Sequence, residues 1–135
     1  MSLFHDQYEF LQAGDVPVGT WAAEDLATQL VEEEFDEWFD EPSYFDNPDF
    51  LEEGEEEYFN INSIKEALDL MYVTAQYLNV TIGPDKAKEA WDALHANNMS
   101  KCTNGKLLKR EDGKVLKPEG YEKLDLSKVL CDTDS

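Results

Sequence analysis

The sequence predicts an all-α helical bundle with a small β-hairpin towards its C-terminal end. Three stretches carry apolar residues at the spacing of a helix face, at about 20–39, 63–79 and 84–98. The last third of the chain instead has basic runs on both sides of Asp112-Gly113, a dipeptide that favours a tight hairpin turn. With 135 residues, of which 41% are apolar, the chain has the size and composition of one folded domain.

The first part of the chain is expected to be an N-terminal arm, residues 1–19, followed by a long helix. The arm can form a short helix with an apolar face of Phe4, Tyr8, Phe10 and Leu11. Thr20 is the predicted N-cap of the long helix, because its hydroxyl can accept a hydrogen bond from an unpaired N–H of the first turn. That helix should end near Phe39 and bury a stripe formed by Leu26, Leu30 and Val31.

An acidic insertion, residues 40–60, precedes the next predicted helix. We expect the insertion to form a loop or a short helix around Asp49–Tyr58. Ser63 and Glu66 have the spacing of a capping box, which predicts a helix over about 63–79. The apolar face of this helix should comprise Leu68, Met71, Tyr72, Ala75 and Leu78.

The final helix and the tail complete the predicted domain. Gly83-Pro84 should open a helix that ends near His95–Asn98, because proline is well suited to the first helical position. This helix is expected to bury a stripe formed by Ala87, Ala90, Trp91 and Leu94. The predicted organisation is thus a single domain, 1–135, with the arm, a helical core over 20–100 and a basic tail over 101–135 that contains the hairpin.

The net charge of −20 narrows the choice of partners. Ten of the eleven lysines and arginines lie between Lys86 and Lys128. Almost all charged residues in the first two thirds of the chain are therefore acidic. Nucleic acid is not an expected partner, because binding to its backbone requires a basic face. The chain has no apolar run of about 18 residues and no charged-then-apolar leader. We therefore expect no membrane partner and a cytoplasmic location, in the host cytoplasm if the protein is viral.

Two acidic clusters are the strongest chemical signal in the sequence. Residues three or four apart share a helix face, so Glu33, Glu34 and Glu37 should project together from one helix, and Glu66 with Asp69 from another. Carboxylates packed this closely repel one another unless a positive charge lies among them. Hard divalent cations with oxygen ligands supply such a charge, so the clusters predict a metal site.

These residues also resemble a known family. Glu33-Glu34-Phe35-Asp36-Glu37 and Glu66-Ala67-Leu68-Asp69 are similar to the E-E-x-x-E and E-x-x-D signatures of the MazG-like all-α nucleoside triphosphate pyrophosphohydrolases. Asn97-Asn98-Met99-Ser100-Lys101 and the stretch from Asp112 to Tyr121 resemble the N-M-S-K and D-G-K-V-x-K-P-x-G-Y elements of the short phage and bacterial members. The insertion at 40–60 departs from the compact family pattern.

The resemblance implies a set of site residues. It makes Glu34, Glu37, Glu66 and Asp69 ligands of two or more Mg²⁺ ions, for which Mn²⁺ can substitute. Glu33 stands beside them, either as a residue that supports the metal ligands or as the base that activates water. It gives phosphate binding to Asn98, Lys101, Lys117 and Tyr121. It places the nucleobase near the arm and the first long helix, so Phe4, His5 and Trp21 are candidates to stack on it.

The activity implied is hydrolysis of a nucleoside triphosphate to its monophosphate and pyrophosphate. A guanine nucleotide, dGTP or GTP, is the preferred substrate, because a tryptophan near the base suits a purine, and dUTP and dCTP are alternatives. A single thin helical layer cannot cover all the apolar stripes described above, so a dimer or tetramer is expected. The family pairs in the same way.

A second hypothesis is a non-catalytic acidic protein that mimics nucleic acid and occupies a basic surface of a partner. It predicts that the total charge of the chain, above all that of residues 40–60, matters more than the geometry of any one cluster. A calcium buffer is disfavoured, because the sequence lacks the D-x-[DN]-x-[DN]-G loop.

Overall fold

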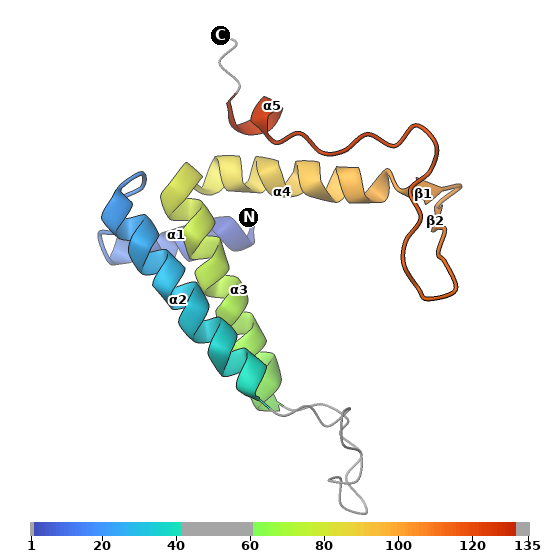
Figure 1. Ribbon diagram of the computed structural model, residues 1–135. Coiled ribbons are helices and arrows are strands. Elements are labelled where there is room, and N and C mark those ends of the chain that lie inside the picture. Colours follow the sequence, from blue (N-terminus) through green and yellow to red (C-terminus); the bar gives the residue numbers. More distant parts are fainter. Residues whose placement is uncertain (1, 42–60, 132–135) are drawn as a thin grey trace, which may run out of the picture. The chain divides into compact units, whose positions relative to one another are not determined.

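The computed structural model describes residues 2–41 and 61–131, which are mostly helical and include a small two-stranded antiparallel sheet (Figure 1). The predicted all-α character, with a small hairpin towards the C-terminal end, is therefore confirmed. The structure forms two compact units, residues 1–84 and 85–135, which we call unit 1 and unit 2. The expectation for the segment 42–60, including a short helix around Asp49–Tyr58, lies outside the described residues. No helix among those residues has the length and apolarity needed to cross a membrane.

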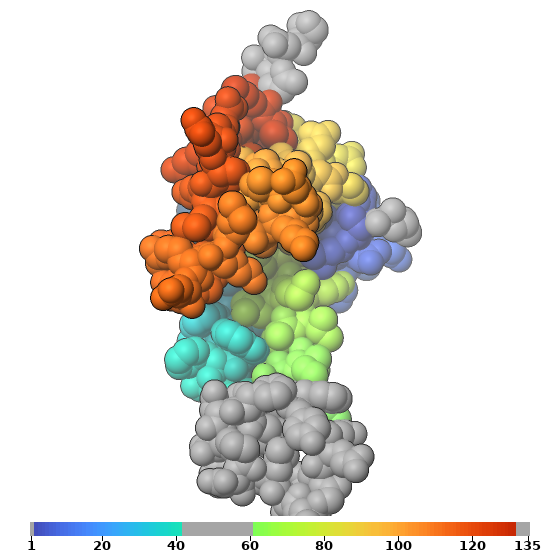
Figure 2. Space-filling model, turned by 90° about the vertical axis from the view of Figure 1, so that its right-hand side faces the viewer, coloured from blue at the N-terminus to red at the C-terminus, as the bar shows by residue number. Residues whose placement is uncertain are grey.

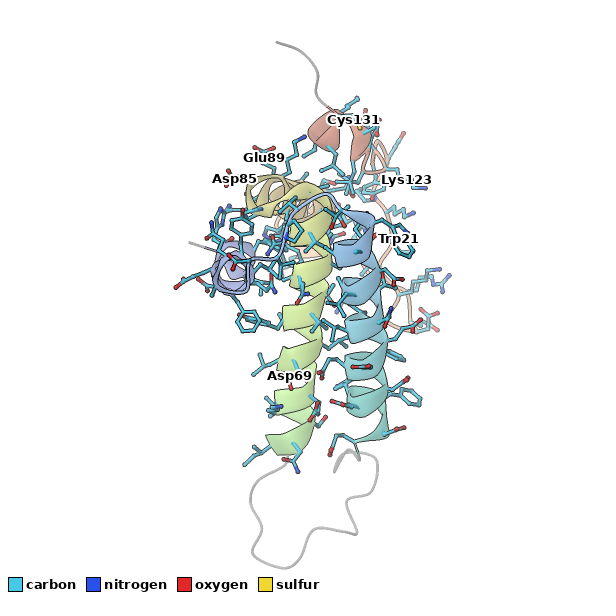
Figure 3. The ribbon with its side chains drawn as sticks, turned by 90° about the vertical axis from the view of Figure 1, so that its left-hand side faces the viewer. Trp21, Asp69, Asp85, Glu89, Lys123 and Cys131 are labelled. Carbon is cyan, nitrogen blue, oxygen red and sulfur yellow. The ribbon has the colours of Figure 1, made fainter. Side chains whose placement is uncertain are left out.

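Unit 1 consists of α1 (Leu3–Ala13), α2 (Trp21–Asp40) and α3 (Ile61–Ile82). Figures 1 and 3 show α2 and α3 side by side over most of their length, and α1 packs against α3. Thr20 caps α2 as predicted, because its Oγ1 accepts a hydrogen bond of 3.2 Å from the backbone N–H of Ala23. The predicted capping box at Ser63 is wrong. Ile61 already belongs to α3, so Ser63 lies inside the helix instead of preceding it.

In the core of unit 1, small residues of α2 pack against α3. Leu11, Ala23, Ala27 and Val80 form its buried cluster, with Tyr8 and Val16 packed against them. The predicted stripe on α2 is therefore misplaced: Leu26 is exposed, and Leu30 and Val31 are only half-buried. Alanines at the contact let the two helix axes approach closely, which turns the larger apolar residues away from the centre.

A buried amide network joins α1 to α3. The Nδ2 of Asn79 donates to the backbone oxygen of Phe4 at 2.8 Å and to the Oε1 of Gln7 at 2.9 Å. The Nε2 of Gln7 donates to the Oε1 of Gln76 at 3.3 Å. All three amide side chains are buried. The α1 helix is thus fixed by polar contacts as well as by Leu11, an arrangement that apolar periodicity alone could not reveal.

The outer face of α3 is apolar and exposed. Of the predicted apolar face only Ala75 is fully buried and Leu78 half-buried, whereas Leu68 is 59% exposed. We call this exposed row the α3 strip, and it consists of Ile61, Ile64, Leu68, Met71 and Tyr72. Phe10 of α1, predicted to be inward, is also exposed and packs edge-on against Tyr72 with ring centroids 5.8 Å apart.

Unit 2 is built on α4 (Pro84–Met99), which begins at proline as predicted. An extended tail leads to the short helix α5 (Ser127–Leu130) and is tied to α4 by side chains. The Nδ2 of Asn97 donates to the backbone oxygen of Glu122 at 2.8 Å, and the Nζ of Lys86 to that of Leu130 at 3.3 Å. The predicted buried stripe of α4 is wrong beyond Ala87: Ala90 is half-buried, and Trp91 and Leu94 are exposed.

The sheet of unit 2 consists of β1 (Cys102–Thr103) and β2 (Lys106–Leu107), in antiparallel register. Asn104 and Gly105 connect them with φ angles of 53° and 77°, the positive values that a type I′ hairpin turn requires. The predicted turn at Asp112-Gly113 also forms, as a three-residue loop. It is closed by a 2.8 Å hydrogen bond from the N–H of Arg110 to the oxygen of Lys114. The turn at Asp112-Gly113 was thus predicted from the sequence, whereas the turn at Asn104-Gly105 was not.

Candidate metal centre

Along the contact between α2 and α3, the residues that face the other helix change from apolar to acidic. Along α2 the residues facing α3 follow helical spacing from Ala23 and Ala27 to Glu34, which is half-buried. Along α3, Val80 lies in the core and Glu66, also half-buried, lies nearer the start of the helix. The same helix contact that buries alanine and valine therefore brings acidic side chains together.

Three of the predicted ligands converge. Glu34, Glu37 and Glu66 each offer a carboxylate oxygen within 4.8 Å of the others, and we call them the carboxylate triad. The Oε2 atoms of Glu34 and Glu66 are buried and have no hydrogen-bond partner among the described residues. Buried carboxylate oxygens without a donor are energetically costly, so their environment favours either a proton or a cation.

The electrostatics of the triad agree with its geometry. Burial, followed by the neighbouring charge of Glu37, raises the pKa of Glu34 above its ordinary value of 4.5. Burial also raises the pKa of Glu66, although the nearby Lys65 ammonium opposes this effect. Both shifts show that the charged forms of these carboxylates are penalised in the protein. A positive ion among them would remove the penalty.

The fourth predicted ligand is paired with a lysine. The Oδ2 of Asp69, which Figure 3 labels on α3, lies 2.5 Å from the Nζ of Lys65 one helical turn away. Asp69 is not part of the triad, but its charge contributes to the raised pKa of Glu34. Glu33, the predicted base, is exposed on α2.

The donor set of the triad fits a hard divalent cation. Its oxygens come only from carboxylates, which Mg²⁺ and Mn²⁺ prefer over nitrogen and sulfur donors. Mg²⁺ typically retains several waters and takes only a few protein ligands, so three converging carboxylates could hold an ion. The two unpartnered, buried oxygens are the atoms that such an ion would satisfy.

The four predicted phosphate-binding residues gather in unit 2 around Tyr121. The Nζ of Lys117 lies 5.5 Å from the centre of the Tyr121 ring, and that of Lys101 lies 5.8 Å from it. The Nζ of Lys101 also donates to the Oδ1 of Asn98 at 3.3 Å. We call Asn98, Lys101, Lys117 and Tyr121 the lysine cluster. Among residues 2–41 and 61–131, neither lysine forms an ion pair with a carboxylate, although the chain is strongly acidic.

Asn97 is the residue that sequence reasoning missed in this part of the chain. Its Oδ1 accepts a hydrogen bond of 2.7 Å from the hydroxyl of Tyr121, while its Nδ2 binds the tail at Glu122. Asn97 thereby orients the ring on which the two lysines lie. Its place directly before the N-M-S-K element was a usable signal.

A cavity of about 520 Å³ opens beside the lysine cluster, within unit 2. Asn97, Ser100 and Tyr121 line it together with Lys123, Asp125 and Lys128. This volume is within the range of small-molecule sites. Unit 2 appears in yellow, orange and red in Figure 2.

The predicted base-binding residues differ in accessibility. Phe4 is 4% exposed and is a core residue of unit 1, so its ring is not accessible for stacking in this conformation. His5 is half-buried, with its Nδ1 2.6 Å from the hydroxyl of Ser2. Trp21, the first residue of α2, is 78% exposed (labelled in Figure 3) and has an open ring face for a ligand.

Comparison with known proteins adds no family. No protein-family model matches the chain. A search of curated proteins gives no significant match. The similarity to MazG-like enzymes accordingly rests on the four motifs in the sequence.

Proposed function

We propose that the protein is a metal-dependent nucleoside triphosphate pyrophosphohydrolase of the MazG-like type. The observation that carries the proposal is the carboxylate triad, in which Glu34, Glu37 and Glu66 from two helices approach within 4.8 Å. A structural role would be better served by apolar residues at this helix contact, because like charges at such distances destabilise the fold. A cation bound among the three carboxylates would offset this repulsion.

The proposal assigns separate tasks to the two clusters. When bound, Mg²⁺ supplies the positive charge and Lewis acidity that hydrolysis of a phosphoanhydride requires. Glu33 would accept the proton of the attacking water, while the triad holds the cation. Lys101 and Lys117 would bind phosphate oxygens through charge, and Asn98 through a directed hydrogen bond. Tyr121 would do the same by exchanging the hydrogen bond that its hydroxyl donates to the Oδ1 of Asn97 for one to phosphate. Attack at the α-phosphorus breaks its bond to the bridging oxygen and releases pyrophosphate.

The test is release of pyrophosphate from a panel of nucleoside and deoxynucleoside triphosphates with Mg²⁺ or Mn²⁺. A guanine nucleotide is the first substrate to examine, followed by dUTP and dCTP. Glu66→Gln is expected to lower kcat by about 100-fold or more, because it removes a charged ligand without changing size. Glu32→Gln is the matched control, since Glu32 is exposed and outside the triad. Absence of turnover with every nucleotide and both metals would refute the proposal.

We further propose that the protein self-associates through the α3 strip. The strip and Phe10 expose a contiguous row of large apolar side chains along unit 1, which water covers poorly. A second copy of the same strip would bury it symmetrically and form a shared helical bundle. Light scattering should report a dimer or tetramer, and Leu68→Glu should convert it to monomer. Leu108→Glu, at an exposed leucine of unit 2, should not.

An acidic, non-catalytic binding protein is the second candidate. It is favoured by the acidic outer surface of α2, where Glu32, Glu33, Asp36 and Asp40 are all exposed. Under this alternative, a basic partner recognises summed charge, and its affinity falls steeply with added salt. Asp69→Asn separates the two ideas: it should abolish hydrolysis in an enzyme and barely change binding by a charge mimic.

A further inference from the structure

Lys65 is the one lysine or arginine in the first 85 positions of the chain, and it lies next to Glu66 of the carboxylate triad. It immediately precedes Glu66 on α3 and forms an ion pair with Asp69 one turn further on. Its positive charge lowers the pKa of Glu66, and the charges of Glu66 and Glu34 in turn raise the pKa of Lys65. Because this part of the chain is otherwise acidic, a generally basic surface does not explain the position of Lys65.

The contact that Lys65 makes is with the remaining predicted ligand. Its Nζ lies 2.5 Å from the Oδ2 of Asp69, four residues later on α3. The side chain of Lys65 is 67% exposed and that of Asp69 is 34% exposed. An exposed pair at this helical spacing is weak, and lysine is a flexible point charge that can swing into water. The ion pair between Lys65 and Asp69 can therefore be broken at a small cost in free energy.

A lysine ammonium and a divalent cation compete for the same carboxylate. Both are attracted to the acidic cluster, and each repels the other when both are near it. Before a cation binds, Lys65 reduces the repulsion among the four carboxylates. Once a cation binds, the same ammonium is a like charge next to it.

We propose that Lys65 is a built-in counterion that occupies Asp69 in the metal-free protein and is displaced when a divalent cation binds, so that Lys65 sets the metal affinity. This inference deepens the proposed function and rests on its metal centre. Lys65 acts through Asp69 and is a positioning residue, with no contact to substrate required. Its removal should tighten the binding of a divalent cation.

The experiment is calorimetric titration of Mn²⁺ into the metal-free protein, residues 1–135. Lys65→Met should bind Mn²⁺ about three- to tenfold more tightly than the wild type, since one nearby positive charge and one competing ion pair are lost. Lys65→Arg keeps the charge and should bind within about twofold of the wild type. Lys65→Gln gives a second neutral variant. Thermal unfolding without metal adds an independent readout, in which the neutral variants should be less stable.

Lys88→Met is the matched control. Lys88 and Asp92 form the same type of exposed pair, with the same spacing and a distance of 2.6 Å, but on α4 in unit 2. Its removal should leave Mn²⁺ affinity unchanged. If the wild type binds Mn²⁺ and both neutral Lys65 variants bind it equally or more weakly, the inference is overturned and the metal centre stands. If neither the wild type nor the variants bind Mn²⁺, the metal centre itself is overturned, and the role of Lys65 falls with it.

Discussion

Replacing Glu34 by glutamine should have opposite effects on stability with and without a divalent cation. Glu34 lies within 4.8 Å of Glu37 and of Glu66, measured between ligand oxygens. Two unit charges at that distance repel by about 0.9 kcal/mol in a medium as polarisable as water. Removing the charge of Glu34 removes two such repulsions, which are partly screened by salt. The free energy of unfolding of the metal-free protein should therefore rise by about 1 kcal/mol. The glutamine amide can also donate to a neighbouring carboxylate, which the original side chain can do only when protonated.

The assay is thermal unfolding in EDTA and again in excess Mg²⁺ or Mn²⁺. In EDTA, Glu34→Gln should raise Tm by about 3 °C, the shift expected of about 1 kcal/mol in a chain of this size. With metal, the wild type should gain stability through binding, and the variant should gain less because it has lost a charged ligand. Glu32→Gln, on the exposed side of the same helix, should change Tm little in either condition. The reasoning fails if Glu34→Gln destabilises the metal-free protein or retains the full metal-induced shift.

Two further predictions concern pH and the amide network. Because burial raises the pKa of Glu34 and Glu66 above 4.5, the folded metal-free protein holds more protons than the unfolded chain between 4.5 and those raised values. The free energy of unfolding of the wild type should therefore fall as pH rises through that interval, and that of Glu34→Gln should fall less steeply. A difference in free energy of unfolding between the two proteins that does not change with pH would contradict this. Asn79→Ala should lower the free energy of unfolding by about 2–4 kcal/mol in urea titration, because it leaves the Phe4 oxygen and the Gln7 amide oxygen without their buried donor. Gln29→Ala, which removes an exposed 2.9 Å bond to Asp25, should cost under about 0.5 kcal/mol.

Local signals in the sequence predicted the helices well. Thr20 and Pro84 mark helix starts through their own chemistry, a side-chain acceptor and a missing N–H, and both operate independently of the rest of the fold. The acidic spacings were equally informative, because helical geometry alone places Glu34 and Glu37 on one face. Convergence with Glu66 additionally required that α2 and α3 pack together, and the structure provides this contact.

The errors arose where packing decides between apolar residues. On α2 the buried positions are Ala23 and Ala27, whereas Leu26 is exposed. Small side chains at the contact allow the two helices to approach closely, and a larger apolar side chain there would keep them apart. Burial was also overestimated on α3 and α4, where a periodic apolar row such as that containing Leu68 is exposed in a single copy of the chain. Periodicity identifies a face, but it does not identify what covers that face.

The alanine contact between α2 and α3 has a consequence for the chemistry at the other end of these helices. Ala27 is completely buried against α3, two helical turns before Glu34. The separation of the two helix axes at this contact fixes how far apart their carboxylates stand further along. A bulkier residue at position 27 would splay the helices and loosen the cation site without touching any ligand. Under the proposed function, metal affinity would thus depend on a position that carries no charge as well as on the acidic residues.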